Sequence, residues 1–118
     1  MSEKLNGGVV FHASSVVKNE YLPNKGVFLG GTLTRARGDG FGFYLGRMEP
    51  GCEISREIHP ETTETVYVLS GKATGIVGDQ EVPLEPGDVL HVEKNVHHGL
   101  RNRGEGVLEF LVIGHPDF

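Results

Sequence analysis

Short runs of alternating apolar and polar residues occupy most of this chain, and glycine, proline and aspartate separate them. Alternation with a period of two places successive side chains on opposite faces of an extended segment, and therefore predicts β-strands. The strands predicted in this way span residues 27–37, 41–48, 53–59, 64–69, 72–77, 80–84, 89–93, 96–102 and 107–113. Many short strands with regular turn signals predict an all-β sandwich or barrel.

Three details refine this prediction. Asp39-Gly40 and Gly78-Asp79 each lie between two strand-like runs and predict hairpins. Residues 14–21 are too short and too rich in valine for a convincing amphipathic helix, so a turn or an edge segment is expected there. Residues 107–113 are almost continuously apolar and predict a strand that is buried on both faces, and residues 115–118 read as a tail.

Size and composition narrow the class of protein. A chain of 118 residues fits one domain, which we expect to span residues 1–118. The formal net charge of -5 comes without a basic patch, which argues against a nucleic-acid partner. We find no signal peptide and no membrane-spanning run, and Cys52 is the only cysteine, so a cytoplasmic protein that is not bound to a membrane is expected.

Histidines and carboxylates recur in two segments, residues 51–71 and 87–102. Strand alternation puts Glu57 and His59 on one face, and Glu64 and His98 lie on apolar faces of later strands. If these faces line one interior, the four side chains meet there. Imidazole nitrogens and carboxylate oxygens are ligands for a divalent metal ion, and Fe, Mn, Zn, Ni and Co all remain possible.

Other side chains are candidates for roles next to this group. Glu61 can replace Glu57 or Glu64 as a ligand if the turn at residues 60–63 is tight. Whichever of Glu57 and Glu61 does not ligate the metal can serve as a general base if burial raises its pKa. Arg47 and Phe43 share one face of their strand; if that face points inward, Arg47 can bind a substrate carboxylate or phosphate. A solvated strand face is the alternative for that pair, and Tyr44 lies on the opposite face.

These segments resemble the two sequence motifs of the cupin superfamily. The first motif, G-x5-H-x-H-x3,4-E-x6-G, is similar to Gly51-x5-Glu57-x-His59-x4-Glu64-x6-Gly71, with Glu57 in place of the first histidine. The second, G-x5-P-x-G-x2-H-x3-N, is similar to residues 87–102, which keep His98 and Asn102 and carry Glu93 and Asn95 at the proline and glycine positions.

The resemblance implies a jelly-roll barrel with its core at about residues 40–114 and N-terminal strands at about residues 9–37. It also implies a homodimer. It implies that His59, Glu64 and His98 are metal ligands, and that Glu57 is one by position. The implied function is a metal-dependent enzyme acting on a small organic molecule, of the dioxygenase, decarboxylase, isomerase or cyclase type. The alternative is a non-catalytic cupin that binds a sugar or an anion at a degenerate site.

Overall fold

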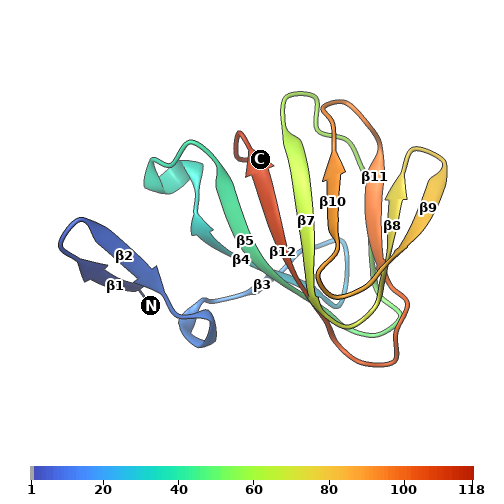
Figure 1. Cartoon of the computed structure of the whole chain (residues 1–118), viewed down its shortest axis with the longest axis horizontal. Helices are drawn as coiled ribbons and strands as arrows, with labels where there is room; N and C mark the ends of the chain where they lie inside the picture. The colour runs from blue at the N-terminus through green and yellow to red at the C-terminus, as the bar shows by residue number, and fades with distance from the viewer. Residues whose placement is uncertain (1) are drawn as a thin grey trace.

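The computed structural model describes residues 2–118 and consists of two antiparallel sheets that together form an open barrel, with a separate N-terminal hairpin (Figure 1). The larger sheet has the strand order β10-β7-β12-β5-β4-β3, and the smaller sheet has the order β6-β11-β8-β9. The strands of the larger sheet are β3 (Asn19–Glu20), β4 (Val27–Leu33), β5 (Gly42–Met48), β7 (Thr63–Ser70), β10 (Val89–Val92) and β12 (Leu108–His115). The strands of the smaller sheet are β6 (Glu53–Glu57), β8 (Ala73–Val77), β9 (Gln80–Leu84) and β11 (His98–Asn102). The all-β prediction is therefore confirmed.

The hydrophobic core lies between the two sheets, because both contribute to one cluster of buried side chains. Val68 and Phe110 of the larger sheet are fully buried, and Ala73 and Leu100 of the smaller sheet are also buried in this cluster. Removing these apolar side chains from water is the main force that holds the sheets together. Among residues 2–118, no helix combines the length and the hydropathy needed to cross a lipid bilayer.

Both predicted hairpins form. Strands β8 and β9 pair on either side of Gly78, which has a φ of 58°, a left-handed value that favours glycine. Strands β4 and β5 also pair, but β4 ends at Leu33 and not at Arg37 as predicted. A short 3-10 helix, η2 (Arg35–Arg37), follows because the Thr34 side chain accepts a hydrogen bond from the Arg37 N–H.

A hairpin at the N-terminus was not predicted. Strands β1 (Ser2–Leu5) and β2 (Gly8–Phe11) pair with each other and lie apart from the barrel (Figure 1). A second 3-10 helix, η1 (Ala13–Ser15), follows them. The dipeptide Asn6-Gly7 was the available signal, since asparagine followed by glycine is a favoured two-residue hairpin turn.

The prediction that residues 107–113 are buried on both faces is wrong. In β12, Leu108, Phe110 and Val112 are buried, whereas Glu109 is exposed. Strand β12 is hydrogen-bonded to a neighbour on each side, so the backbone is central in the sheet. Only one face of the sheet packs on the core, and the other face forms the outside of the barrel.

Candidate metal centre

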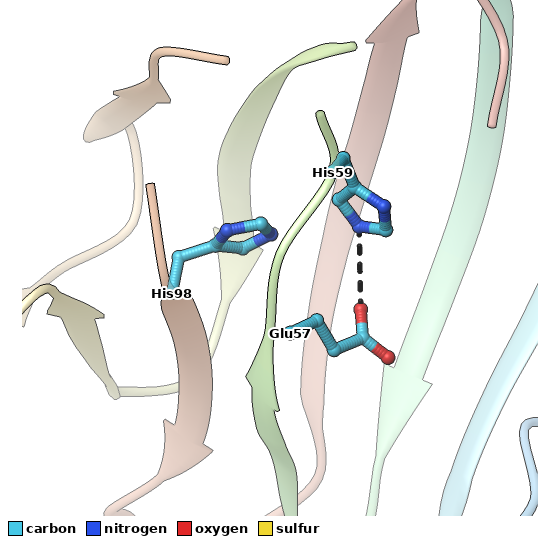
Figure 2. A group of neighbouring side chains, drawn as sticks. All are labelled: Glu57, His59 and His98. Atoms are coloured by element: carbon cyan, nitrogen blue, oxygen red, sulfur yellow. Dashed lines mark ion pairs between the residues drawn. The ribbon is translucent and has the colours of Figure 1, made fainter. Parts of the chain in front are cut away.

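Four side chains from both sheets converge at one end of the barrel. Glu57 ends β6, and its backbone is the pairing partner of His98 at the start of β11. Glu64 enters from β7 of the facing sheet, and His59 lies in the loop between β6 and β7. The ligand atoms of Glu57, His59 and His98 lie within 4.8 Å of one another (Figure 2). The predicted convergence of Glu57, His59, Glu64 and His98 is present in the structure.

His59 has a buried nitrogen without a hydrogen bond. Its Nε2 atom lies 3.5 Å from Glu57 Oε1 and 3.6 Å from Glu64 Oε1. Both distances exceed a normal hydrogen bond, and no atom within residues 2–118 hydrogen-bonds to this nitrogen. An unsatisfied buried polar atom costs roughly 1–3 kcal/mol and calls for an explanation. A cation between the imidazole and the carboxylates would satisfy it.

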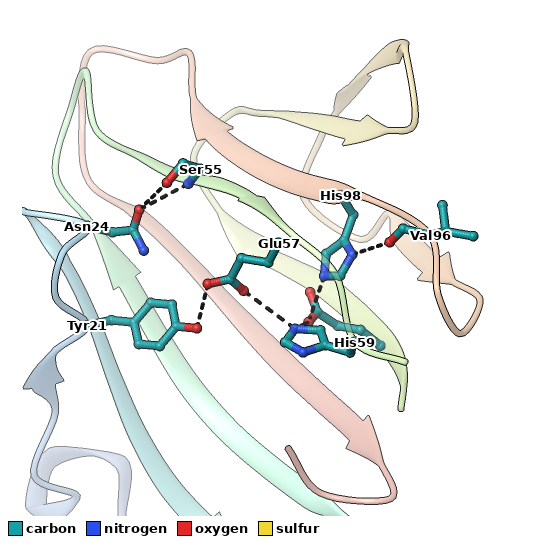
Figure 3. Close-up of polar contacts among 8 residues, drawn as sticks. Tyr21, Asn24, Ser55, Glu57, His59, Val96 and His98 are labelled. Carbon is teal, nitrogen blue, oxygen red and sulfur yellow. Dashed lines mark hydrogen bonds and ion pairs between the residues drawn. The ribbon is translucent and has the colours of Figure 1, made fainter. Parts of the chain in front are cut away.

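His98 is held in one orientation by the backbone. Its Nδ1 lies 2.9 Å from the Val96 carbonyl oxygen, which can only accept a hydrogen bond, so Nδ1 carries a proton (Figure 3). The Nε2 atom then faces Glu64 Oε1 at 3.2 Å. Such a bond from the second ring nitrogen to a carbonyl is typical of metal-binding histidines. Burial by itself lowers the pKa of His98, but the hydrogen bonds to Glu64 and Val96 raise it overall.

Glu57 divides its two oxygens between different partners. Oε1 faces His59, while Oε2 accepts a 2.6 Å hydrogen bond from the Tyr21 hydroxyl (Figure 3). Tyr21 is fixed because its N–H donates to Val27 O at 2.7 Å. Burial, followed by the hydrogen bond to Glu57, raises the pKa of Tyr21 well above its ordinary value, so the hydroxyl keeps its proton at neutral pH.

The donor set fits a divalent metal ion. Two imidazoles and two carboxylates match the ligand chemistry of first-row dications. All four side chains are at least partly buried, and the exposed fraction is 5% for the side chain of His98 and 13% for that of Glu64. Two carboxylates that both lie this close to the same imidazole nitrogen repel each other unless a cation or a proton lies between them.

A cavity of about 350 Å³ opens beside this cluster. Glu57, His59 and Glu64 form its polar end, while Leu29 and Ile54 belong to its apolar wall. Cavities of this size hold small organic ligands. The cluster is therefore accessible to a molecule bound in the barrel.

Arg47 and Phe43 lie on the other face of β5, so the expectation that they line the interior and bind substrate is not met. Arg47 is exposed, pairs with Glu49 at 3.3 Å and covers the ring of Phe28. Phe43 lines a shallow depression against the N-terminal hairpin instead. The reason is the alternation of side chains along the strand. Tyr44, Gly46 and Met48 face the interior, so the positions between them face outward.

Glu61 is also outside the cluster. It is exposed in the bend that follows Pro60, and it is not part of the cavity wall. The bend leaves Glu64 as the inward carboxylate at the start of β7. The suggestion that Glu61 acts as a ligand or a base therefore has no geometric support.

Several cavity residues were missed because they lie outside the motifs. Tyr21 comes from the segment expected to be a turn or an edge, and Phe118 from the presumed tail. The ring of Phe118 packs edge-on against His59, with 4.9 Å between the ring centroids, and lies tilted against Tyr44, with 5.9 Å between the centroids. Asp117 holds this segment by accepting hydrogen bonds from the Arg35 N–H at 2.7 Å and the Tyr44 hydroxyl at 2.6 Å. The sequence carries no short-range signal for these long-range contacts.

Comparison with known proteins identifies the family. Residues 44–114 match the family described as the cupin domain, which is more than half of the chain. The protein therefore belongs to the cupin family, and its small single-domain barrel agrees with that assignment.

Individual relatives cover only part of the sequence. The chain is 28% identical over 67 residues to an oxalate-binding protein of Thermotoga maritima, a match that covers 57% of this chain and 55% of that one. It is 43% identical over 51 residues to quercetin 2,3-dioxygenase of Bacillus subtilis, covering 43% of this chain and 15% of that one. The chain thus spans about half, or much less, of the length of these relatives.

The fold is shared more widely than the sequence. A crystal structure described as a predicted oxalate decarboxylase from Thermotoga maritima superposes with a TM-score of 0.83 at 23% identity. The match covers 91% of this chain and 98% of that one. At this level of identity the likeness establishes the barrel architecture alone.

Proposed function

We propose that this cupin is a metal-dependent enzyme that acts on a small organic molecule in its barrel. The observation that carries the proposal is the buried His59 Nε2, which has no hydrogen bond among residues 2–118 and faces two carboxylates beside His98. A divalent ion held by Glu57, His59, Glu64 and His98 would supply Lewis-acid chemistry to oxygen atoms of the substrate. Fe, Mn, Zn, Ni and Co are the candidate ions.

The protein residues divide the remaining work. The Val96 carbonyl fixes the ring of His98, and the backbone bond from Asn95 N–H to His59 O at 2.9 Å ties the His59 loop to the segment before β11. The Tyr21 hydroxyl keeps Glu57 Oε2 occupied and leaves Oε1 turned toward His59. Should Glu57 not ligate the ion, it is the carboxylate best placed to hold or move a proton at the cavity, with Tyr21 as the adjacent hydrogen-bond donor.

Metal content is the direct test. Protein purified without an affinity tag is analysed for bound metal by mass spectrometry, together with His59→Ala and His98→Ala. His97→Ala is the matched control, because His97 is exposed and adjacent to His98 in sequence. We expect roughly stoichiometric bound metal in the wild type and in the control. The two cluster variants should bind the metal about tenfold or more weakly and should therefore be purified with less of it. Equal metal content in all four proteins would end the proposal.

A binding cupin without turnover is the second candidate, and one contact favours it. Glu57 stands where the cupin motif has a histidine, and its Oε2 is already satisfied by Tyr21. A carboxylate that is already paired in this way is less free to act as a metal ligand or a base, so the site can bind a ligand such as a sugar or an anion without catalysis. Visible spectra of the Co²⁺-substituted protein report on exchangeable ligand positions, and a panel of small substrates reports on turnover. Ligand-induced spectral change without any product would favour this second function.

A further inference from the structure

We infer that the cavity selects uncharged, flat aromatic molecules with oxygen substituents along one edge, and disfavours small dianions such as dicarboxylates and phosphate esters. The inference rests on the proposed function, since it names the class of ligand for the same site. Three features of the cavity carry it: the sign of its charge, its apolar wall and the position of its polar end.

The charge of the cavity is negative. Glu20, Glu57 and Glu64 line it, and no lysine or arginine is among its lining residues within the described part of the chain. Even with a dication bound, three carboxylates leave the site with an excess of negative charge. A dianion would enter a partly desolvated region of like charge without a guanidinium to pair with it. Arg47, the one arginine considered for this purpose, lies on the other face of its strand.

Much of the cavity lining besides the carboxylates is apolar and partly aromatic. Leu29, Ile54 and Val112 contribute aliphatic surface, and the rings of Tyr44 and Phe118 stand close to each other on it. A small dicarboxylate would leave this surface in contact with water. A flat ring covers it and gains both hydrophobic burial and ring–ring contacts.

The aromatic wall is held in place by the fold. Gly42 and Gly114 are paired with each other in adjacent strands, and a side chain on them would collide with Asp117 and with the ring of Phe118, respectively. Asp117 is only 5% exposed and is bonded to the Tyr44 hydroxyl, so the two aromatic residues are connected through it. The wall is thus a preformed surface, which lowers the entropic cost of binding a rigid ligand.

Oxygen substituents are needed at the other end of the ligand. The ring of Phe118 contacts His59, so a molecule stacked along the wall ends at the His59 and Glu57 side chains. The carboxylates of Glu57 and Glu64 accept hydrogen bonds from hydroxyl groups. A pair of neighbouring hydroxyls on an aromatic ring therefore fits this end better than a carboxylate pair does.

Two probes with the same ring separate charge from shape. We compare 2,3-dihydroxynaphthalene, which is neutral at pH 7, with naphthalene-2,3-dicarboxylate, and include oxalate as a small dianion. Dissociation constants are measured by isothermal titration calorimetry on Mn²⁺-loaded and on chelator-treated full-length protein. We expect the dissociation constant of the neutral ring to be lower than that of either dianion by about tenfold or more, because like charges in an interface are strongly unfavourable.

Two variants test the aromatic wall. Phe118→Ala removes a ring at the cavity, and Phe28→Ala removes a ring that lies outside it beneath Arg47. We expect Phe118→Ala to weaken binding of the neutral ring by about fivefold and Phe28→Ala to leave it unchanged. Equal effects of the two variants would overturn the assignment of the wall.

The remaining outcomes separate this inference from the proposed function. Dianions that bind as tightly as the neutral ring, or the absence of binding by all three probes, would overturn the inference even in protein that takes up metal. A protein that takes up no metal but keeps the preference for the neutral ring would instead contradict the proposed function alone. The carboxylates and the wall are present in both forms, so the preference is expected with and without Mn²⁺.

Discussion

Replacing Asp117 by alanine is expected to destabilise the whole barrel, although this residue lies in a segment that the sequence presents as a tail. Asp117 is 5% exposed, and its carboxylate accepts hydrogen bonds from the Arg35 N–H and the Tyr44 hydroxyl, both far away in the sequence. Arg35 also donates from its side chain to the Asp117 carbonyl at 2.8 Å. The segment after β12 is thereby attached to β5 and to the turn that precedes it.

The size of the effect follows from the partners that would be left behind. Each of these partly buried donors that loses its acceptor costs at most about 1–3 kcal/mol. With the Arg35 N–H and the Tyr44 hydroxyl both affected, we expect the free energy of unfolding to fall by about 2–4 kcal/mol. Urea denaturation followed by circular dichroism measures this difference. Tyr44→Phe removes only one of the two donors and is expected to cost about 1 kcal/mol.

The same contacts predict a pH dependence. Burial by itself raises the pKa of Asp117, but the hydrogen bonds from the Arg35 N–H, the Tyr44 hydroxyl and the Phe118 N–H bring it below its ordinary value of 3.8. A carboxyl group with a lowered pKa in the folded state stabilises the protein above its unfolded-state pKa, and this contribution is lost as the pH falls through the folded-state pKa.

Asp117→Asn provides the comparison, because the amide keeps an acceptor oxygen and does not titrate. We expect the stability difference between wild type and Asp117→Asn to be constant near neutral pH and to shrink below about pH 4. A difference that stays constant down to about pH 3, or a loss below about 1 kcal/mol in Asp117→Ala, would refute the reasoning.

Three further predictions concern the core and the outer surface. Gly46→Ala is expected to cost about 1–3 kcal/mol in urea denaturation, because its new methyl group meets the buried ring of Phe110; an unchanged midpoint would contradict this packing. Asn102→Ala should cost about 2–3 kcal/mol in the same assay, since the buried amide donates to two backbone carbonyls, at 3.0 and 2.9 Å, that would lose their partner; a loss below about 0.5 kcal/mol would count against it. Arg47→Ala should change the free energy of unfolding by less than about 0.5 kcal/mol and leave ligand binding in the cavity, measured by calorimetry, unaltered. Weaker ligand binding in this variant would show that Arg47 contributes to the site.

The sequence was sufficient to predict the strands and the metal-ligand candidates. Alternation with a period of two is a local property, and the turn residues that interrupt it act over a few positions, so both can be read without coordinates. The same alternation put Glu57 and His59 on one face, and the two motif segments carried the resemblance to the cupins. The structure brings these side chains together with Glu64 and His98.

The choice between the two faces of β5 needed the tertiary structure. The alternating pattern predicts that Phe43 and Arg47 share one face of the strand and that Tyr44 lies on the other. It does not predict which of the two faces packs on the core. The fully buried Met48 settles this, because it shares its parity with Tyr44. The residues expected to bind substrate therefore lie on the outside of the barrel.

The cavity wall was decided entirely by long-range contacts. Tyr21 reaches Glu57 across 36 positions of the sequence, and Asp117 reaches Arg35 across 82. No periodic pattern links residues so far apart, since strand periodicity describes only the nearest few positions. The chain alone thus determined which side chains can carry chemistry, while the closing of the barrel decided which aromatic and acidic residues surround them and hence what the cavity can admit.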